Sequence, residues 1–312
     1  MRRVVKSKLI SIRSSIEVLG EKVFKLSVIS DEVSQDFERV AKFAKRMELD
    51  GIEIRTVWNL KPQELVKRLG DLKKILKEYD LEVSAIASPF FKANIDDPKE
   101  YEEHIEILKR CIELAKSLDT NIIRGFTFWW KGPIEENIER ILEKFQKPLE
   151  MIESEGVILG VENEPSTFVR NGKELAFFLS KLKSKNVKAL WDPGNDIWDP
   201  TGEVPYPDGY SYVRNKVVHV HVKDGKRLGK GECEFTPVGE GEVDYRGQLK
   251  ALVEDGYRGY LSLETHWRPK KKLAEEEVLR PGGAAYSELG EEASEICMKN
   301  LKRIIEEVLE SI

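Results

Sequence analysis

Residues 216–226 of the chain read KVVHVHVKDGK, and this stretch decides how the rest of the sequence is interpreted. Its β-branched run predicts a buried strand, which breaks off at Lys-Asp-Gly. Two of the four histidines in the chain, His219 and His221, lie in this strand. Because side chains alternate between the two faces of a strand, both imidazoles point to the same side. The surrounding sequence has to explain why a core strand carries two of them.

Seven other short apolar runs resemble this one, and longer amphipathic segments with Lys/Glu-rich polar faces separate them. Such alternation predicts βα units around a parallel sheet. Eight strands is the number that closes a (β/α)8 TIM barrel, and a chain of 312 residues can form one such barrel as a single α/β domain. The predicted strands cover residues 25–30, 51–55, 81–87, 121–126, 157–163, 187–192, 216–222 and 259–265.

The barrel is expected to occupy residues 23–312, with residues 1–22 as a short N-terminal extension. The extension begins with basic residues, but Lys8 and Arg13 interrupt each apolar run before it reaches the length of a signal-peptide core. No repeat, low-complexity tract or Pro/Gly linker divides the remaining chain. We therefore predict no domain boundary within residues 23–312.

Two connections are longer than usual and are predicted to be loops that cover a site. They are residues 223–243, after the strand quoted above, and residues 266–289, after the last predicted strand. Both carry Gly, Pro and aromatic residues.

Composition narrows the classes of partner. The net charge is −5, with acidic and basic residues interspersed, so the sequence lacks the basic stripe that nucleic-acid binding usually needs. The three cysteines show no C-x-x-C spacing, which argues against a zinc ribbon or a disulfide framework. We expect a cytoplasmic protein that acts on a small molecule, with no nucleic-acid or membrane partner. Because barrels often pair through their helices, a homo-oligomer stays open.

Four consecutive predicted strands end on residue types that bind metal ions. In a parallel barrel the strand ends meet at one rim, which is where active sites are built. One carboxylate at a strand end is more often a helix cap or a salt-bridge partner. Three carboxylates and an imidazole would instead repel one another unless a cation lay among them. Their oxygen-rich set suits one divalent ion, Mn²⁺ first and Mg²⁺, Co²⁺ or Zn²⁺ as alternatives. The predicted ligands are Glu162, Asp192, His221 and Glu264, with His219 as a supporting residue one layer deeper.

The motifs that carry these residues resemble those of the xylose-isomerase-like barrel superfamily. The similar segments are VISDEVSQDFERVAKFAK, GIEIR, VENEPS, WDPGN, HVHVKD, PVGEGEVDY and LSLE, and together they span about residues 23–310. The sugar isomerase and epimerase branch of that superfamily includes ketose 3-epimerases, hydroxypyruvate isomerases and inositol-pathway enzymes. The resemblance implies one divalent ion held by the same four residues, with Glu162 and Glu264 also serving as the acid/base pair.

The implied activity is that of a metal-dependent isomerase or epimerase of a monosaccharide or sugar-like substrate. Protons would move through a metal-bound enediolate, because an ion that grips a carbonyl acidifies the adjacent C–H. Two glutamates on opposite faces of the substrate would serve an epimerase, and one would suffice for an aldose–ketose shift. We expect raised pKa values for both glutamates, so that each can exchange protons near neutral pH.

Further residues are candidates for substrate binding. Arg227 matches a substrate-binding arginine of the ketose epimerases but is equally consistent with an exposed loop residue. Trp129 could form an apolar wall or pack within its loop. For Glu53, with Arg124, an ion pair inside the barrel is favoured over a substrate role. The full set of candidates is Arg227, Asn195, Lys223, Asp224, His266, Trp129 and Glu53.

Asn195 departs from the pattern of the superfamily, where many relatives carry histidine. An amide can hydrogen-bond a hydroxyl, but it does not exchange protons near neutral pH and is a poor metal ligand. The substrate of the best-known epimerases therefore does not transfer directly to this chain.

Three other functions compete with this interpretation. A metal-dependent dehydratase of an inosose-type keto-polyol needs the same ion and the same bases, so it is the main alternative. An apurinic-site endonuclease is disfavoured by the few histidines and the lack of a basic face. A non-catalytic sugar-binding barrel would not need an acid/base pair.

Overall fold

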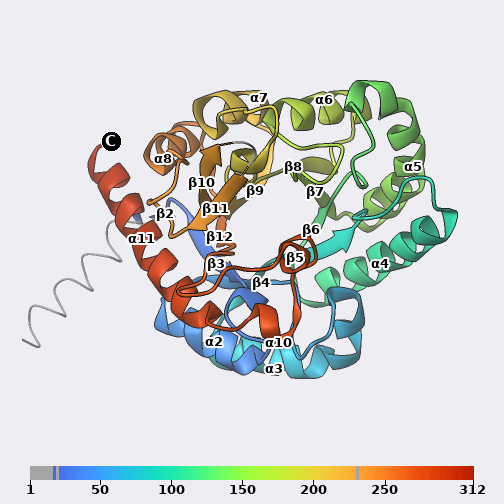
Figure 1. Ribbon diagram of the computed structural model, residues 1–312. Coiled ribbons are helices and arrows are strands. Elements are labelled where there is room, and N and C mark those ends of the chain that lie inside the picture. Colours follow the sequence, from blue (N-terminus) through green and yellow to red (C-terminus); the bar gives the residue numbers. More distant parts are fainter. Residues whose placement is uncertain (1–16, 19–20, 230–231) are drawn as a thin grey trace, which may run out of the picture.

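The computed structural model describes residues 17–18, 21–229 and 232–312, and eight of its strands close into a parallel barrel (Figure 1). The barrel order is β12-β3-β4-β5-β6-β7-β8-β9. Leu263 of β12 pairs with Val28 of β3 on one side and with Val222 of β9 on the other, which closes the ring. The bounds are β3 Lys25–Ile29, β4 Gly51–Ile54, β5 Glu82–Phe90, β6 Ile122–Gly125, β7 Ile158–Glu162, β8 Val187–Trp191, β9 Val217–Val222 and β12 Tyr260–Leu263.

This architecture confirms the TIM barrel predicted from the sequence, and each of the eight predicted strands has its counterpart. Before the barrel, the two-residue strands β1 (Glu17–Val18) and β2 (Glu21–Lys22) pair antiparallel with each other. Most of the predicted extension, residues 1–16 and 19–20, lies outside the described residues.

Helices surround the strands, as the amphipathic segments predict (Figure 1). At the start of α4, the Asp97 side chain accepts hydrogen bonds from the backbone N–H groups of Lys99 and Glu100, and Pro98 occupies the first turn. No helix in the described part of the chain is long and apolar enough to cross a membrane. The longer helices are α2 Phe37–Arg46, α3 Leu69–Tyr79, α4 Pro98–Ser117, α5 Ile134–Glu155, α6 Gly172–Leu182, α8 Tyr245–Glu254 and α11 Gly290–Glu310.

Short helical segments follow several strands near the rim where the site is expected. The segments η1 and η3 come directly after β3 and shortly after β8, respectively. The short segments are η1 Ser30–Glu32, η2 Pro62–Arg68, η3 Asn195–Trp198, η4 Pro205–Gly209, α7 Tyr210–Val213, α9 Glu275–Leu279 and α10 Gly283–Tyr286.

Buried aromatic rings fix the carboxyl-terminal ends of β5 and β6. The Phe91 ring stacks on Phe90 and on Phe128, with ring centroids 3.9 and 4.0 Å apart, and meets the edge of Phe145 of α5 at 5.1 Å. All four rings are fully buried. Burial of one such ring stabilises a fold by about 2–3 kcal/mol, so the cluster holds this part of the rim in a defined position.

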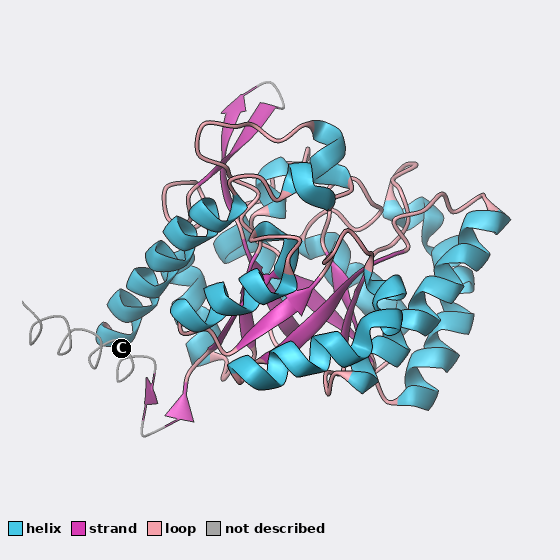
Figure 2. Ribbon diagram, turned by 90° about the horizontal axis from the view of Figure 1, so that it is seen from below, coloured by secondary structure: helices cyan, strands magenta, loops and turns pink. Residues whose placement is uncertain are grey.

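The two long connections cover the same end of the barrel. Residues 223–243, predicted to be a loop, instead contain a hairpin of β10 (Asp224–Gly229) and β11 (Glu232–Thr236), which projects beyond the barrel strands in Figure 2. The connection 266–289 carries α9 and α10 and lies across the barrel mouth.

Candidate metal centre

The four predicted ligands converge at the carboxyl-terminal rim of the barrel. Glu162 ends β7, Asp192 follows β8, His221 lies in β9 and Glu264 follows β12. All four are buried, and one ligand atom of each lies within 4.8 Å of those of the other three. His221 Nδ1 is 3.4 Å from Glu162 Oε1, 3.6 Å from Glu264 Oε2 and 3.9 Å from Asp192 Oδ2. The group is compact enough to hold one ion.

Glu53 of β4 sets the orientation of the His221 ring. Its carboxylate accepts a hydrogen bond from His221 Nε2 at 3.0 Å and from His219 Nε2 at 2.8 Å. His221 Nδ1 is buried and has no hydrogen-bond partner among the described residues. A ligand histidine usually gives its other N–H to a carboxylate in this way. The unpartnered nitrogen among three carboxylates therefore fits a divalent ion, and the second imidazole of the strand, His219, shares its supporting carboxylate.

Neighbouring cations, more than burial, set the pKa values of the two glutamates. Burial raises the pKa of Glu162, but the charges of Arg124 and His221 outweigh it and lower this pKa to about 2. In the same way the charges of Lys223 and Arg55 outweigh burial and hold the pKa of Glu264 well below its usual value. The expectation of raised pKa values for both glutamates is therefore wrong, and both carboxylates are ionised at neutral pH.

Asp192 behaves in the opposite way. Burial, reinforced by the charges of Glu264 and Glu162, raises its pKa to about 7, although Lys223 lowers it. Its Oδ2 atom is buried and has no hydrogen bond of good geometry within the described chain.

Three buried cations surround the carboxylates. Lys223 Nζ lies 2.8 Å from Asp192 Oδ2 and 2.7 Å from Glu264 Oε2. Arg124 Nη1 lies 3.2 Å from Glu162 Oε2 and 3.7 Å from Glu264 Oε1. Glu264 is thus held from two sides by these residues, and a third cation reaches it from the first half of the barrel.

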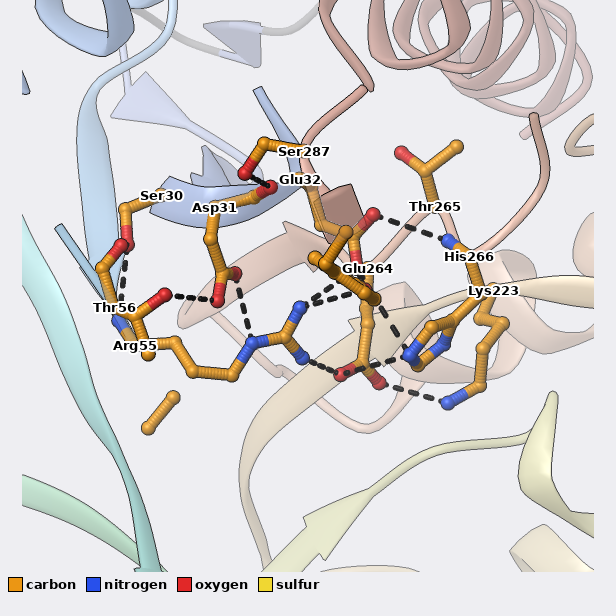
Figure 3. Close-up of polar contacts among 12 residues, drawn as sticks. Ser30, Asp31, Glu32, Arg55, Thr56, Lys223, Glu264, Thr265, His266 and Ser287 are labelled. Atoms are coloured by element: carbon orange, nitrogen blue, oxygen red, sulfur yellow. Dashed lines mark hydrogen bonds and ion pairs between the residues drawn. The ribbon is translucent and has the colours of Figure 1, made fainter. Parts of the chain in front are cut away.

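That third cation is Arg55, which follows β4 and lies among the carboxylates of Asp31, Glu32 and Glu264 (Figure 3). It pairs with Glu264 and lies 2.8 Å from both Asp31 Oδ1 and Glu32 Oε1 of η1. The hydroxyl of Tyr286 in α10 donates to Glu32. Of these residues Glu264 was predicted and the others were not, yet Asp31, Glu32 and Arg55 also follow strand ends. The signal that points to them is the same as for the ligands: charged residues soon after the ends of two barrel strands, β3 and β4.

A cavity of about 540 Å³ opens above the ligands. This volume is in the range of small-molecule sites. Both connections predicted to cover a site contribute to its wall. Residues of the candidate set that line it are Glu162, Glu264, Lys223, Asn195 and His266, together with Arg124, Lys92, Trp198, Phe235, Arg268, Lys270 and Leu273.

Three of the predicted substrate residues, Lys223, Asn195 and His266, line the cavity with polar atoms near the ligands. Asn195 Nδ2 donates to Glu162 Oε1 at 3.0 Å and to the Asn163 carbonyl at 2.8 Å. The His266 ring stacks on Phe235 with centroids 5.0 Å apart, and neither ring nitrogen has a hydrogen-bond partner in the described chain. Burial lowers the pKa of His266 to about 3, so the ring is neutral and has one donor and one acceptor to offer.

Arg227, Asp224, Trp129 and Glu53 do not line this cavity, and their contact with substrate stays a prediction. Arg227 Nη2 donates to the carbonyls of Asp196 and Glu203, at 2.6 and 2.7 Å, and so braces the hairpin against a neighbouring loop. The Asp224 carboxylate accepts hydrogen bonds from backbone N–H groups of residues 225, 239, 241 and 243. Trp129 packs under the Arg280 guanidinium, 5.8 Å from its ring centroid, and Glu53 is occupied by the two histidines.

Comparisons with known proteins agree with this fold. A family model described as xylose isomerase-like TIM barrel matches residues 41–282. L-ribulose-5-phosphate 3-epimerase UlaE of Escherichia coli O157:H7 is 24% identical over 177 residues, which cover 56% of this chain and 60% of the epimerase. Inosose dehydratase of Clostridium perfringens is 25% identical over 227 residues, which cover 64% of this chain and 75% of the dehydratase.

Solved structures of low sequence identity share the fold. A D-tagatose 3-epimerase-like protein superposes with a TM-score of 0.69 at 21% identity, covering 92% of this chain and 99% of its own. The IOLI protein, solved with a zinc atom, superposes with a TM-score of 0.71 at 19% identity, covering 91% of this chain and 99% of its own. The match of the family model over most of the barrel, together with the observed architecture, shows that the chain belongs to the xylose isomerase-like TIM barrel family.

Proposed function

We propose that the protein is a divalent-metal-dependent isomerase or epimerase of a monosaccharide or sugar-like substrate. One observation carries the proposal: the unpartnered Nδ1 of His221 faces three buried carboxylates, two of which, Glu162 and Glu264, line a 540 Å³ cavity. Relatives that include a sugar-phosphate 3-epimerase support it.

The ion would be held by Glu162, Asp192, His221 and Glu264, with Mn²⁺ as the expected ion and Mg²⁺, Co²⁺ or Zn²⁺ as alternatives. When bound, it would supply Lewis acidity that makes a C–H next to a substrate carbonyl easier to deprotonate. Glu53 would keep the His221 ring in the orientation that leaves Nδ1 free.

The two glutamates would carry the protons. Both line the cavity and are ionised at neutral pH, so either can accept a proton from carbon. Removal by one and return by the other would epimerise a carbon, while one glutamate acting alone would move a carbonyl along the chain. His266, neutral and with both nitrogens free, would orient a substrate hydroxyl.

The test is deuterium exchange in D₂O with Mn²⁺, followed by NMR over ketoses, aldoses, sugar acids and inosose-type ketones. We expect exchange at a carbon next to a carbonyl, and its position separates an epimerase from an isomerase. Glu162→Gln and Glu264→Gln should each lower the exchange rate at least about 100-fold. Glu164→Gln is the control, because Glu164 lines the same cavity but pairs with Lys92 at 2.9 Å. Full exchange in both catalytic variants would refute the assignment.

A dehydratase is the second candidate, supported by the match to inosose dehydratase over 75% of that protein. Proton removal would be the same first step, followed by expulsion of a β-hydroxyl as water. In the same NMR experiment, a dehydratase would convert a keto-polyol into an unsaturated product that absorbs in the ultraviolet. An isomerase or epimerase would leave the substrate formula unchanged.

A further inference from the structure

Lys223 carries a positive charge at the place where the ligands would hold a positive ion. Its Nζ atom contacts Asp192 Oδ2 at 2.8 Å and Glu264 Oε2 at 2.7 Å, and its side chain is 3% exposed. The same two oxygens face His221 Nδ1, at 3.9 and 3.6 Å. An ammonium group and a divalent ion would therefore compete for the same two oxygens.

Hydrogen bonds to the backbone of Lys223 hold it in this position. Its N–H donates to Tyr245 Oη at 2.9 Å, and the same hydroxyl donates to its carbonyl at 2.7 Å. On the opposite side, a Cβ at Gly194 would lie 2.4 Å from that carbonyl oxygen. The WDPGN turn can approach Lys223 only because residue 194 is glycine, so two separate elements are shaped around this lysine.

The charge of Lys223 compensates the ligand carboxylates when no ion is bound. Glu162, Asp192 and Glu264 are buried together, and carboxylates so close repel one another unless cations compensate them. Glu264 also pairs with Arg55 and Arg124. Among the described residues, Asp192 Oδ2 pairs with Lys223 and has a longer contact with His221. Removal of one partner from a buried ion pair leaves an uncompensated charge and is strongly destabilising.

We propose that the Lys223 ammonium is a tethered counter-cation of the ligand set. It stabilises the cluster when no ion is bound and competes with the divalent ion for Asp192 Oδ2 and Glu264 Oε2. The inference rests on the proposed function only in assigning a divalent ion to these four ligands. It explains how three buried carboxylates coexist in a folded protein before metal is loaded, and it makes Lys223 a determinant of metal affinity.

The test uses calorimetry to compare Mn²⁺ binding by EDTA-treated wild type and Lys223→Met, which keeps most of the length of the side chain and removes its charge. We expect the dissociation constant to fall about tenfold or more in the variant, because a competing charge has been removed. In EDTA, the denaturant midpoint of the variant should fall below that of the wild type. Unchanged or weaker Mn²⁺ binding by Lys223→Met would overturn the proposal.

Lys92→Met is the matched control. Lys92 is also a largely buried lysine of the cavity wall, but it pairs with Glu164, which is not a candidate ligand. Its loss should leave the Mn²⁺ dissociation constant unchanged. An equal gain in affinity in both variants would mean that the cavity responds to total charge, and the specific role of Lys223 would be refuted.

A second measurement does not depend on the folding of Lys223→Met. In wild-type protein labelled with ¹⁵N-lysine, the buried Lys223 ammonium should give a protected resonance, assigned by its loss in Lys223→Arg. We expect Mg²⁺ to shift that resonance or abolish its protection. A resonance that stays unchanged at saturating Mg²⁺ would refute the competition.

These experiments separate the inference from the proposed activity, since neither uses turnover. Tighter Mn²⁺ binding by Lys223→Met, together with no deuterium exchange on any substrate, would uphold the counter-cation and reject the isomerase. Exchange that depends on both glutamates, together with unchanged affinity in Lys223→Met, would do the reverse.

Discussion

At the scale of single residues, Glu53 is the most informative side chain outside the ligand set. It is fully buried and bonded to both histidines of β9, so its charge and its position act together on His221. Glu53→Gln should weaken Mn²⁺ binding about 10- to 100-fold, which is the usual cost of losing the partner of a ligand histidine. Calorimetry on EDTA-treated protein measures it, with Glu164→Gln as the control. Unaltered affinity would show that Glu53 serves packing alone.

His104 gives a second prediction at this scale, on stability and pH. Its Nδ1 accepts a hydrogen bond from the Phe91 N–H at 2.8 Å, and burial lowers its pKa from 6.5 to about 4. The unfolded chain therefore takes up the proton first as the pH falls. The free energy of unfolding should decrease between pH 6.5 and pH 4 by up to about 3 kcal/mol and level off below pH 4 as far as this group is concerned. Urea titrations of wild type and His104→Gln test this, and a parallel pH dependence in both proteins would contradict it.

At the scale of elements, an aromatic stack joins the β10–β11 hairpin to the cavity wall. Phe235 of β11 lies 4.2 Å from the Trp198 ring centroid and 5.0 Å from that of His266. Phe235→Ala should raise KM about tenfold and reduce hydrogen-exchange protection over residues 224–236, because the hairpin loses its contact with the cavity wall. Leu228→Ala, on the same hairpin but 54% exposed, should change neither. Intact protection in Phe235→Ala would refute this role of the stack.

The elements also show what the sequence can and cannot predict. Strands and ligands follow from local rules: β-branched runs mark the strands, and a parallel barrel brings all strand ends to one rim. The pairing of Arg55 with Glu264 joins residues 209 positions apart and depends on the stagger of the closed sheet, which no single strand encodes. The hairpin was missed because its sequence, GKRLGKGECEF, is polar and glycine-rich, and its buried anchor Asp224 is satisfied by backbone groups from residues 225–243.

At the scale of the whole molecule, a bound ion should stabilise the native barrel, because the unfolded chain does not assemble the four ligands. At a free Mn²⁺ concentration of 100 times the dissociation constant, the gain is about 2.7 kcal/mol. Thermal unfolding should shift upward with Mn²⁺ and return on addition of EDTA. Asp192→Asn should respond much less, because the amide is a weaker ligand than the carboxylate. An equal shift in that variant would place the ion elsewhere.

The ligands and several of the buried charges that support them come from different halves of the chain. Glu53, Arg55 and Arg124 precede Gly156, the exposed end of α5, and all four ligands follow it. A protein split after Gly156 would therefore carry its ligands on one fragment and most of their supporting charges on the other. Neither fragment could bind the ion tightly by itself, so recovery of metal affinity would report reassembly of the barrel from its two pieces.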